Sequence, residues 1–188
     1  MLLPHYILVS GKAENGKDVV AEFMKERLEQ EGKKVYILHY ADHLKEIART
    51  FYNWDGEKDI YGRTLLQSLG DSDGRIKRNN NLYYVEHLIT LIKYLLDKDD
   101  YVIIPDVRYP FEIGYVRDNL NPHDTMCTIR VTRRNFKSKL TEEQLQHESE
   151  IALDNYDEFD YYIANDILEQ LKDNVCFLCD RILKREEC

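Results

Sequence analysis

The sequence predicts an α/β domain built on a parallel sheet. Short apolar runs with the character of strands alternate along the chain with segments whose apolar residues recur at helical spacing. Such alternation favours parallel strands, because the connection between two of them is normally a helix. The apolar run at residues 101–104 is uninterrupted, as expected for a central strand that is covered on both faces.

The expected elements follow one another without an internal repeat or an interdomain linker. Strands are expected at residues 6–9, 35–39, 101–104, 127–132 and 161–164. Helices are expected at residues 17–31, 42–51, 64–70, 82–96, 110–119 and 168–182. Asp42 is the expected N-cap of the second helix, and Thr141 and Gln144 have the spacing of a capping box.

The composition indicates one globular domain, residues 1–188. A chain of 188 residues with 43% hydrophobic residues can bury a full core. The net charge of −9 argues against duplex DNA or an anionic membrane as the main partner. The longest apolar runs are too short to cross a bilayer, and Pro4, His5 and Lys12 interrupt any secretory signal near the start. We therefore expect a cytoplasmic protein that binds neither nucleic acid nor membrane.

The four cysteines do not have the spacing of a disulfide framework. Cys176 and Cys179 form a lone C-x-x-C pair inside a segment that is expected to be helical, and no second pair of ligands follows at zinc-finger spacing. Two interpretations of this pair are open, a metal or redox role and a pair of reduced thiols.

A glycine-rich segment, residues 10–18, lies between the first expected strand and the first expected helix. Gly11, Gly16 and Lys17 have the G-x4-G-K spacing of a Walker A motif. In such a loop, backbone N–H groups and the positive end of the helix dipole face one cavity that suits nucleotide phosphates. The alternative is a glycine turn that binds nothing. The residues expected to bind the donor, ATP, in this segment are Gly11, Lys12, Ala13, Glu14, Asn15, Gly16, Lys17, Asp18 and Val19.

Two aspartates are candidates for a Mg²⁺ site. The Walker A motif ends in Ser or Thr, whose hydroxyl ligates Mg²⁺, whereas this sequence has Asp18, whose carboxylate can bind the metal directly or through water. Asp106 follows the buried run at residues 101–104, as does the acid that holds Mg²⁺ or its water in P-loop proteins. The alternative for Asp106 is a capping aspartate in the turn between strand and helix.

Three arginines follow expected strands and are candidates for stabilising phosphoryl groups. Arg108 lies two residues after Asp106, and Arg133 and Arg134 follow the fourth strand. The segment from residue 133 to residue 150 occupies the place of a kinase lid, so Arg133 and Arg134 could close over ATP. The alternative is that these two arginines are ordinary solvated surface residues. His147, within the same segment, is interpreted as an orienting or structural residue, because an acceptor phosphate needs no general base.

Four motifs, in this order, resemble the deoxynucleoside monophosphate kinases of tailed phages and their bacterial relatives. They are SGK…GKD at residues 10–18, LQSLGD at 66–71, IPDVR…E at 104–112 and HESE at 147–150. The segment from residue 148 to residue 160 is also similar to the animal-type phosphomevalonate kinases of the same wider group. The resemblance covers residues 6–174, nearly the whole chain.

This resemblance implies a three-layer αβα P-loop fold of the nucleoside monophosphate kinase type, with a five-stranded parallel sheet of order 2-3-1-4-5. It implies ATP and Mg²⁺ as cofactors and an acceptor-binding region at about residues 42–84. The phage pattern has a tryptophan where this sequence has Tyr84, which makes the stacking platform smaller. The positions that match acceptor contacts of the family are Lys45, Arg63, Gly70, Tyr84, Asp106, Arg108 and Glu112.

Two further features bear on the acceptor. Tyr83 and Tyr84 offer aromatic faces on which a base can stack. Gln67 offers a paired hydrogen-bond donor and acceptor for the edge of a base. The alternative is that both tyrosines only pack within their helix. The sequence does not determine the base, the sugar or the oligomeric state, and a homodimer is one of the alternatives.

Three hypotheses of function follow. The leading one is ATP-dependent phosphoryl transfer to a nucleoside or deoxynucleoside monophosphate, with Lys17, Asp106, Arg108 and Arg134 as the catalytic residues. The second is a kinase for another phosphorylated small molecule, such as phosphomevalonate. The third is a P-loop module that binds a nucleotide without transferring phosphate.

Overall fold

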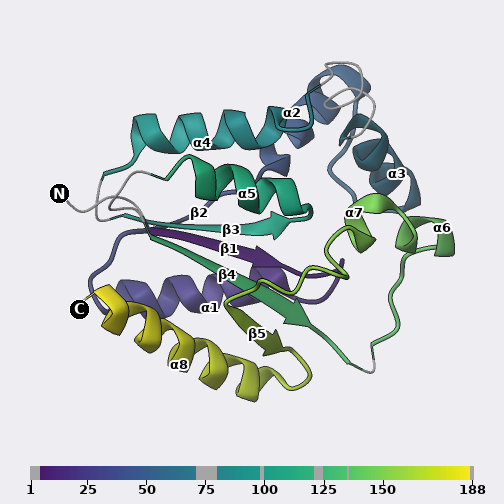
Figure 1. Cartoon of the computed structure of the whole chain (residues 1–188). Helices are drawn as coiled ribbons and strands as arrows, with labels where there is room; N and C mark the ends of the chain where they lie inside the picture. The colour runs from purple at the N-terminus through teal and green to yellow at the C-terminus, as the bar shows by residue number, and fades with distance from the viewer. Residues whose placement is uncertain (1–4, 71–79, 98–99, 121–124, 135, 187–188) are drawn as a thin grey trace.

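The computed structural model of the chain describes residues 5–70, 80–97, 100–120, 125–134 and 136–186 (Figure 1). Its five strands form one sheet in the order β2-β3-β1-β4-β5, and every neighbouring pair is parallel. This order and the parallel pairing confirm the fold predicted from the sequence. The strands are β1 (His5–Ser10), β2 (Val35–Ile37), β3 (Tyr101–Val107), β4 (Thr125–Thr132) and β5 (Tyr161–Ala164).

Helices cover both faces of the sheet, which makes three layers (Figure 1). On one face lie α4 (Tyr83–Leu95) and α5 (Pro110–Asp118), with α2 (Ala41–Tyr52) and α3 (Ile60–Ser68) beyond the start of α4. On the other face lie α1 (Lys17–Gln30) and α8 (Leu168–Glu186).

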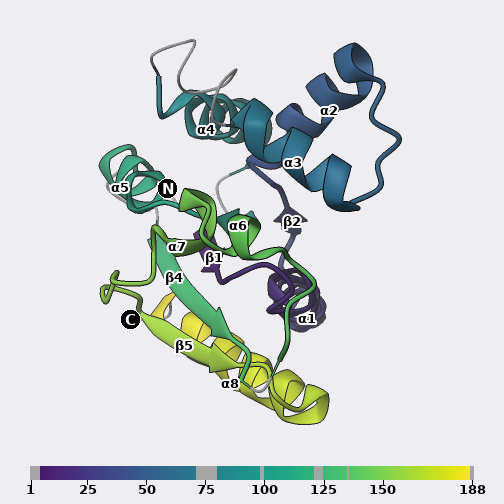
Figure 2. The same ribbon diagram turned by 90° about the vertical axis from the view of Figure 1, so that its right-hand side faces the viewer.

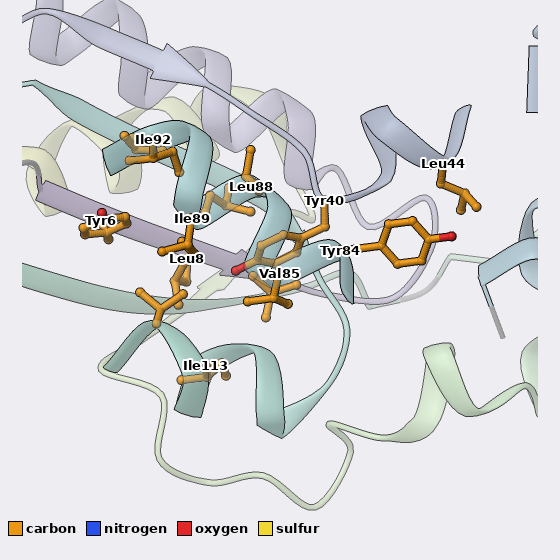
Figure 3. Packing of buried hydrophobic residues seen from close by; sticks show 14 of the residues in the cluster. Tyr6, Leu8, Tyr40, Leu44, Tyr84, Val85, Leu88, Ile89, Ile92 and Ile113 are labelled. Carbon is orange, nitrogen blue, oxygen red and sulfur yellow. The ribbon is translucent and has the colours of Figure 1, made fainter. Parts of the chain in front are cut away.

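The alternation of side chains along β1 divides the core into two clusters, because successive residues of a strand point to opposite faces. Tyr6 and Leu8 pack with residues of α4 and α5, whereas Ile7 and Val9 pack with residues of α1 and α8. Figure 3 shows the first cluster, in which the Tyr84 ring extends towards Leu44 of α2, at the end remote from Tyr6.

The chain beyond β4 crosses the carboxyl ends of the strands before it returns to β5. This segment contains two short helices, α6 (Glu142–Leu145) and α7 (Glu148–Ile151). In Figure 2, which faces the carboxyl ends, α6 lies between α3 and α1, and α7 lies on the side of α5 and β4. Ligands of open parallel sheets bind at this edge. The predicted lid segment is therefore next to the loop that joins β1 to α1.

Several predicted bounds agree with the structure. β5 has the predicted residues, α1 ends one residue before the predicted end, and Thr141 forms the predicted capping box with Gln144 at α6. Other predicted bounds were wrong by a few residues. β3 continues to Val107 rather than ending at residue 104. β2 ends at Ile37 rather than at residue 39, and α3 begins at Ile60 because Asp59 accepts a hydrogen bond from the Gly62 amide (2.7 Å).

The predicted N-cap of α2 was also wrong. The helix begins at Ala41, so Asp42 lies within its first turn, and the Asp42 carboxylate pairs with Lys45 (2.8 Å). The start of α2 is capped instead by Asp106, whose two carboxylate oxygens accept hydrogen bonds from the amides of Tyr40 and Ala41 (3.0 and 2.9 Å). An aspartate of β3 thus fixes the start of a helix that begins 65 residues earlier in the chain.

Within the described ranges, no helix is long and apolar enough to cross a membrane. Cys127, Cys176 and Cys179 are free thiols, and no group of three or more His, Cys, Asp or Glu side chains in the described part of the chain is placed to hold a metal. Cys179 is fully buried in α8, and burial raises its pKa to about 12. Its thiol is therefore protonated and unreactive, which agrees with the reduced-thiol interpretation.

Candidate active site

The segment between β1 and α1 forms a tight loop that two glycines make possible. Gly16, at the start of α1, has a φ of +86°, and a Cβ there would lie 2.1 Å from Nδ2 of Asn165. A Cβ on Gly11 would lie 2.6 Å from the backbone oxygen of Val131. Asn165 also donates a hydrogen bond to the Asn15 carbonyl (2.9 Å), so the loop is held by the chain that follows β5. The predicted Walker A segment is therefore a packed turn at the carboxyl edge of the sheet.

Lys17, the first residue of α1, is buried, and its Nζ donates a hydrogen bond to the Lys12 carbonyl (3.0 Å). Burial, and to a smaller extent the nearby Arg108 guanidinium, lower the pKa of Lys17 to about 7, against the opposite effect of Glu150. An anionic ligand beside this amine would favour its charged form. The free and bound states of the loop should then differ in proton content.

We expect phosphate binding to be accompanied by proton uptake at Lys17. At about pH 8, above the lowered pKa, the amine is mostly neutral in the free protein, so a bound polyphosphate should draw in roughly one proton. At about pH 6 the amine is already charged and the uptake should vanish. Calorimetric titration with pyrophosphate in two buffers of different ionisation enthalpy measures this uptake. Lys17→Met, which has no titratable amine, is the control, and an uptake at pH 8 that persists in that variant would assign the proton to another group.

The turn after β3 holds Arg108 by its backbone. The Glu112 carboxylate is buried and accepts hydrogen bonds from the amides of Arg108 (2.6 Å) and Tyr109 (3.0 Å), as part of the capping box of α5. Glu112 was predicted to contact the acceptor, and it lines the cavity described below. Its bond to the Arg108 amide fixes the backbone position from which the Arg108 side chain extends.

Arg108 reaches the lid segment. Its Nη1 donates to the Ser149 carbonyl (3.3 Å) and forms an ion pair with Oε1 of Glu150. The other oxygen of Glu150 accepts a hydrogen bond from the Ala13 amide of the glycine-rich loop (2.7 Å). One carboxylate of α7 therefore joins the arginine that follows β3 to the loop that follows β1.

Glu14 makes a second connection between the same loop and the lid segment. Its Oε2 accepts hydrogen bonds from the Ser138 hydroxyl and the Lys139 amide (both 2.9 Å), and its Oε1 lies 3.5 Å from Nη2 of Arg63 in α3. The Lys139 amide is the largest of the effects that lower the pKa of Glu14. Glu14 has a φ of +62°, which is uncommon for a residue other than glycine. The loop, the lid segment and the acceptor-binding region thus meet at this side chain.

Asp18 and its neighbours supply the carboxylates near the mouth of the loop. The Asp18 side chain is 76% exposed, and its Oδ1 lies 3.2 Å from Nε2 of His39. This hydrogen bond is the main cause of the lowered pKa of Asp18 and of the raised pKa of His39, which also lies 3.5 Å from Asp42. An exposed, ionised carboxylate is what Mg²⁺ requires when substrate phosphates complete its shell. Each carboxylate oxygen of Asp106 accepts one hydrogen bond from a backbone amide, which leaves a lone pair on each oxygen that can accept a hydrogen bond from a metal-bound water. The residues present therefore fit the predicted ion.

One cavity of about 430 Å³ brings most of these residues together. The glycine-rich loop, the turn after β3, the lid segment and the α2–α3 region each contribute to its wall. It contains every position that was predicted to contact the acceptor. The predicted residues that line it are Ala13, Glu14, Lys17, Asp18, Lys45, Arg63, Gln67, Gly70, Tyr84, Asp106, Arg108 and Glu112.

Arg133 and Arg134 do not line this cavity. Both are exposed; the Arg133 guanidinium stacks on Phe136 (4.4 Å to the ring centroid), and the Arg134 amide donates to Asp166 (2.7 Å). Arg133 lies, with Lys12 and Asn15, around a separate hollow of about 540 Å³ near the carboxyl end of β4. Val19 is partly exposed on α1, and neither hollow includes it. The predicted roles of Arg133 and Arg134 at bound ATP stay predictions.

The lining residues that were not singled out as site residues from the sequence include His39, Lys58, Tyr109 and Glu150. Tyr109 carries no sequence signal, because it precedes an ordinary helix start. Glu150 was part of a motif that supported the resemblance, yet its contact with Ala13 spans 137 positions and has no local signature. His39 and Lys58 could have been found by asking which polar residues follow β2 and precede α3, since both segments lead to the carboxyl edge of the sheet.

His147 also lines the cavity, and its ring has a structural role. Nδ1 of His147 accepts a hydrogen bond from the Ser149 amide (3.3 Å), so the ring caps the start of α7. This geometry agrees with the structural interpretation of His147.

No protein-family model matches the sequence, and a comparison with curated proteins gives no match. Among solved structures, a gluconokinase from Sinorhizobium meliloti is similar over 100% of this chain and 98% of its own, with a TM-score of 0.53 and 12% identity. An APS kinase from Mycobacterium tuberculosis is similar over 96% and 99% of the two chains, with a TM-score of 0.49 and 15% identity. A shikimate kinase from Aquifex aeolicus is similar over 95% and 98%, with a TM-score of 0.48 and 10% identity. The chain therefore has the fold of the P-loop kinases, with a five-stranded parallel sheet of order 2-3-1-4-5 and helices on both sides.

Proposed function

We propose that this chain is an ATP-dependent kinase that transfers a phosphoryl group to a nucleoside or deoxynucleoside monophosphate, giving the diphosphate. The observation that carries the proposal is the cavity of about 430 Å³, which Lys17 and Asp18 line together with Arg63, Gln67 and Tyr84. A donor on the glycine-rich loop and an acceptor between α2, α3 and α4 would share this one space. Phosphoryl transfer requires such positioning more than it requires covalent chemistry.

On the donor side, the loop amides and Lys17 would hold the phosphates of ATP. Mg²⁺, when bound, would neutralise charge on the phosphate oxygens, with Asp18 as a ligand and Asp106 holding a water of the ion. Arg108, whose backbone is held by Glu112, would stabilise negative charge on the transferred group. These roles rest on the shared cavity and on the chemistry of the side chains.

On the acceptor side, three cations and one aromatic ring line the cavity. Lys45, Lys58 and Arg63 come from α2, the following connection and α3, and they suit an anionic acceptor inside a chain of net charge −9. Tyr84 is 7% exposed, and its hydroxyl donates to the Leu69 carbonyl (3.5 Å). A base could stack on the part of the ring that faces the cavity, while Gln67 pairs with its edge.

A coupled assay of ADP release against a panel of acceptors tests the function. The panel contains the ribo- and deoxyribonucleoside monophosphates and phosphomevalonate, each with ATP and Mg²⁺. We expect turnover with at least one nucleoside monophosphate, loss of activity in chelator and recovery with Mg²⁺ or Mn²⁺. Turnover of phosphomevalonate with every nucleotide inert would replace the proposed acceptor. Binding of ATP without any turnover would replace the proposed kinase by a nucleotide-binding module.

Tyr84→Ala should raise KM for the nucleotide acceptor and leave KM for ATP nearly unchanged. Stacking of a base on an aromatic side chain is worth about 1–3 kcal/mol, so the expected increase in KM is between about 5-fold and 150-fold. Tyr84→Phe keeps the ring and loses only the bond to Leu69, and it should leave KM close to wild type. Because Tyr84 also belongs to the core, thermal unfolding of both variants must accompany the kinetics. Equal KM values for the Phe and Ala variants would show that the acceptor does not stack on this ring.

A further inference from the structure

The Glu150 carboxylate lies where the glycine-rich loop and Arg108 offer their hydrogen-bond donors. One oxygen accepts the Ala13 amide at 2.7 Å, and the other pairs with the Arg108 guanidinium. The Glu150 side chain is only 5% exposed, and its charge affects the pKa of Lys17. A backbone amide of this loop, an arginine and a lysine therefore surround one carboxylate.

This combination of donors has the chemistry of a site for a phosphoryl group. Loop amides and an arginine fork bind phosphate oxygens by the same hydrogen bonds that they make to a carboxylate. A buried carboxylate is favourable only where such partners replace the water that it loses. A phosphoryl group that needs the Ala13 amide and the Arg108 guanidinium must therefore compete with Glu150.

We propose that Glu150 is an internal anion that occupies a phosphoryl subsite in the ligand-free protein and is displaced when a nucleotide binds. The subsite consists of the Ala13 amide and the Arg108 guanidinium, beside Lys17, and its ligand is the terminal phosphoryl group of a polyphosphate. The proposal rests on the proposed function, because it takes the loop as the place that binds the donor phosphates.

Glu150 can leave the subsite while the rest of the lid segment stays attached to the glycine-rich loop. Glu14 holds the segment separately, through the Ser138 hydroxyl and the Lys139 amide. Glu150 belongs to the four-residue helix α7, whose start is capped by His147. A small rotation of α7 would thus withdraw the carboxylate while residues 138–139 stay attached. In this arrangement the apparent affinity for phosphate equals the intrinsic affinity multiplied by the fraction of ligand-free molecules in which Glu150 has left the subsite.

Glu150→Gln tests the proposal by removing the negative charge while keeping an oxygen that can accept the Ala13 amide. The probe is inorganic pyrophosphate, measured by calorimetry without turnover. We expect Glu150→Gln to bind pyrophosphate about tenfold more tightly than the wild type, because the competing anion is gone. The matched control is Glu148→Gln, which makes the same change of charge at an exposed position of the same helix. Its affinity should equal that of the wild type.

Equal or weaker binding by Glu150→Gln, with the wild type still binding pyrophosphate, would overturn the internal anion and leave the proposed function standing. Absence of pyrophosphate binding in both proteins would overturn both. Equal gains in the Glu150 and Glu148 variants would also contradict the proposal, because the effect would then be one of overall charge.

Hydrogen exchange on the wild-type protein gives a test that does not depend on the folding of a variant. The amides of Glu150 and Ala152 donate to the carbonyls of His147 and Glu148 within α7. We expect saturating pyrophosphate to speed exchange at these amides, since the helix loses its attachment through Glu150, and to slow exchange in residues 13–17. Unchanged or slower exchange in α7 with protected loop amides would show that phosphate binds without displacing Glu150.

Discussion

Lys17→Ala should lower turnover with ATP by about 100-fold or more while the protein stays folded. A preorganised charge directed at a reacting group is worth several kcal/mol of transition-state stabilisation, and Lys17 is the buried cation at the start of α1. The amine is a poor contributor to stability, because burial opposes its charged form and lowers its pKa to about 7. Between about pH 7 and the ordinary pKa of a lysine, the unfolded chain binds a proton at this amine that the folded protein does not bind. The free energy of unfolding of the wild type should therefore rise with pH over that interval, and that of Lys17→Ala should not.

The matched control for this variant is Lys25→Ala, on the same helix. Lys25 is a surface cation whose partner is Glu29 (3.9 Å), so its loss should change turnover little. Steady-state rates at saturating ATP, with thermal unfolding as the check on folding, separate the two variants. Turnover of Lys17→Ala near that of the wild type would show that the glycine-rich loop does not hold the donor.

The fold was predictable from the sequence because its signals are local. The uninterrupted apolar run in β3 and the regular helical spacing in α4 each depend on neighbouring residues, and the structure confirms both. The error at the start of α2 arose because a remote residue decided the outcome. Asp42 has the features of a helix cap, yet Asp106 caps α2 from the end of β3, and no pattern within residues 35–52 can show this.

The same distinction separates the predicted and the missed parts of the site. The glycine-rich loop is one contiguous segment, and its spacing alone indicated where α1 begins and which lysine faces the cavity. The contacts of Glu150 with Ala13 and Arg108 join segments that are 137 and 42 positions apart. Only the order of the strands brings these segments to one edge of the sheet. The sequence therefore predicted many of the residues that gather there, but not that a carboxylate of the lid segment pairs with the arginine.

Arg108→Ala should lower turnover by about 1,000-fold with every phosphorylated acceptor, as expected when an arginine that stabilises the transferred group is lost. Arg108→Lys keeps the charge but not the planar fork, and we expect it to recover only part of the loss. Arg117→Ala is the matched control, because Arg117 lies on α5 and pairs at the surface with Glu158 (3.6 Å). It should leave turnover unchanged.

The double variant Arg108→Ala with Glu150→Gln separates catalysis from the contact seen in the structure. If Arg108 only fastened Glu150, its loss would matter little once the Glu150 charge is gone, and the double variant would match Glu150→Gln in turnover. If Arg108 stabilises the transferred phosphoryl group, its loss should lower turnover by a similar factor in both backgrounds. We expect the second result, because the backbone bond from the Arg108 amide to Glu112 holds this residue at the cavity whether or not Glu150 is present.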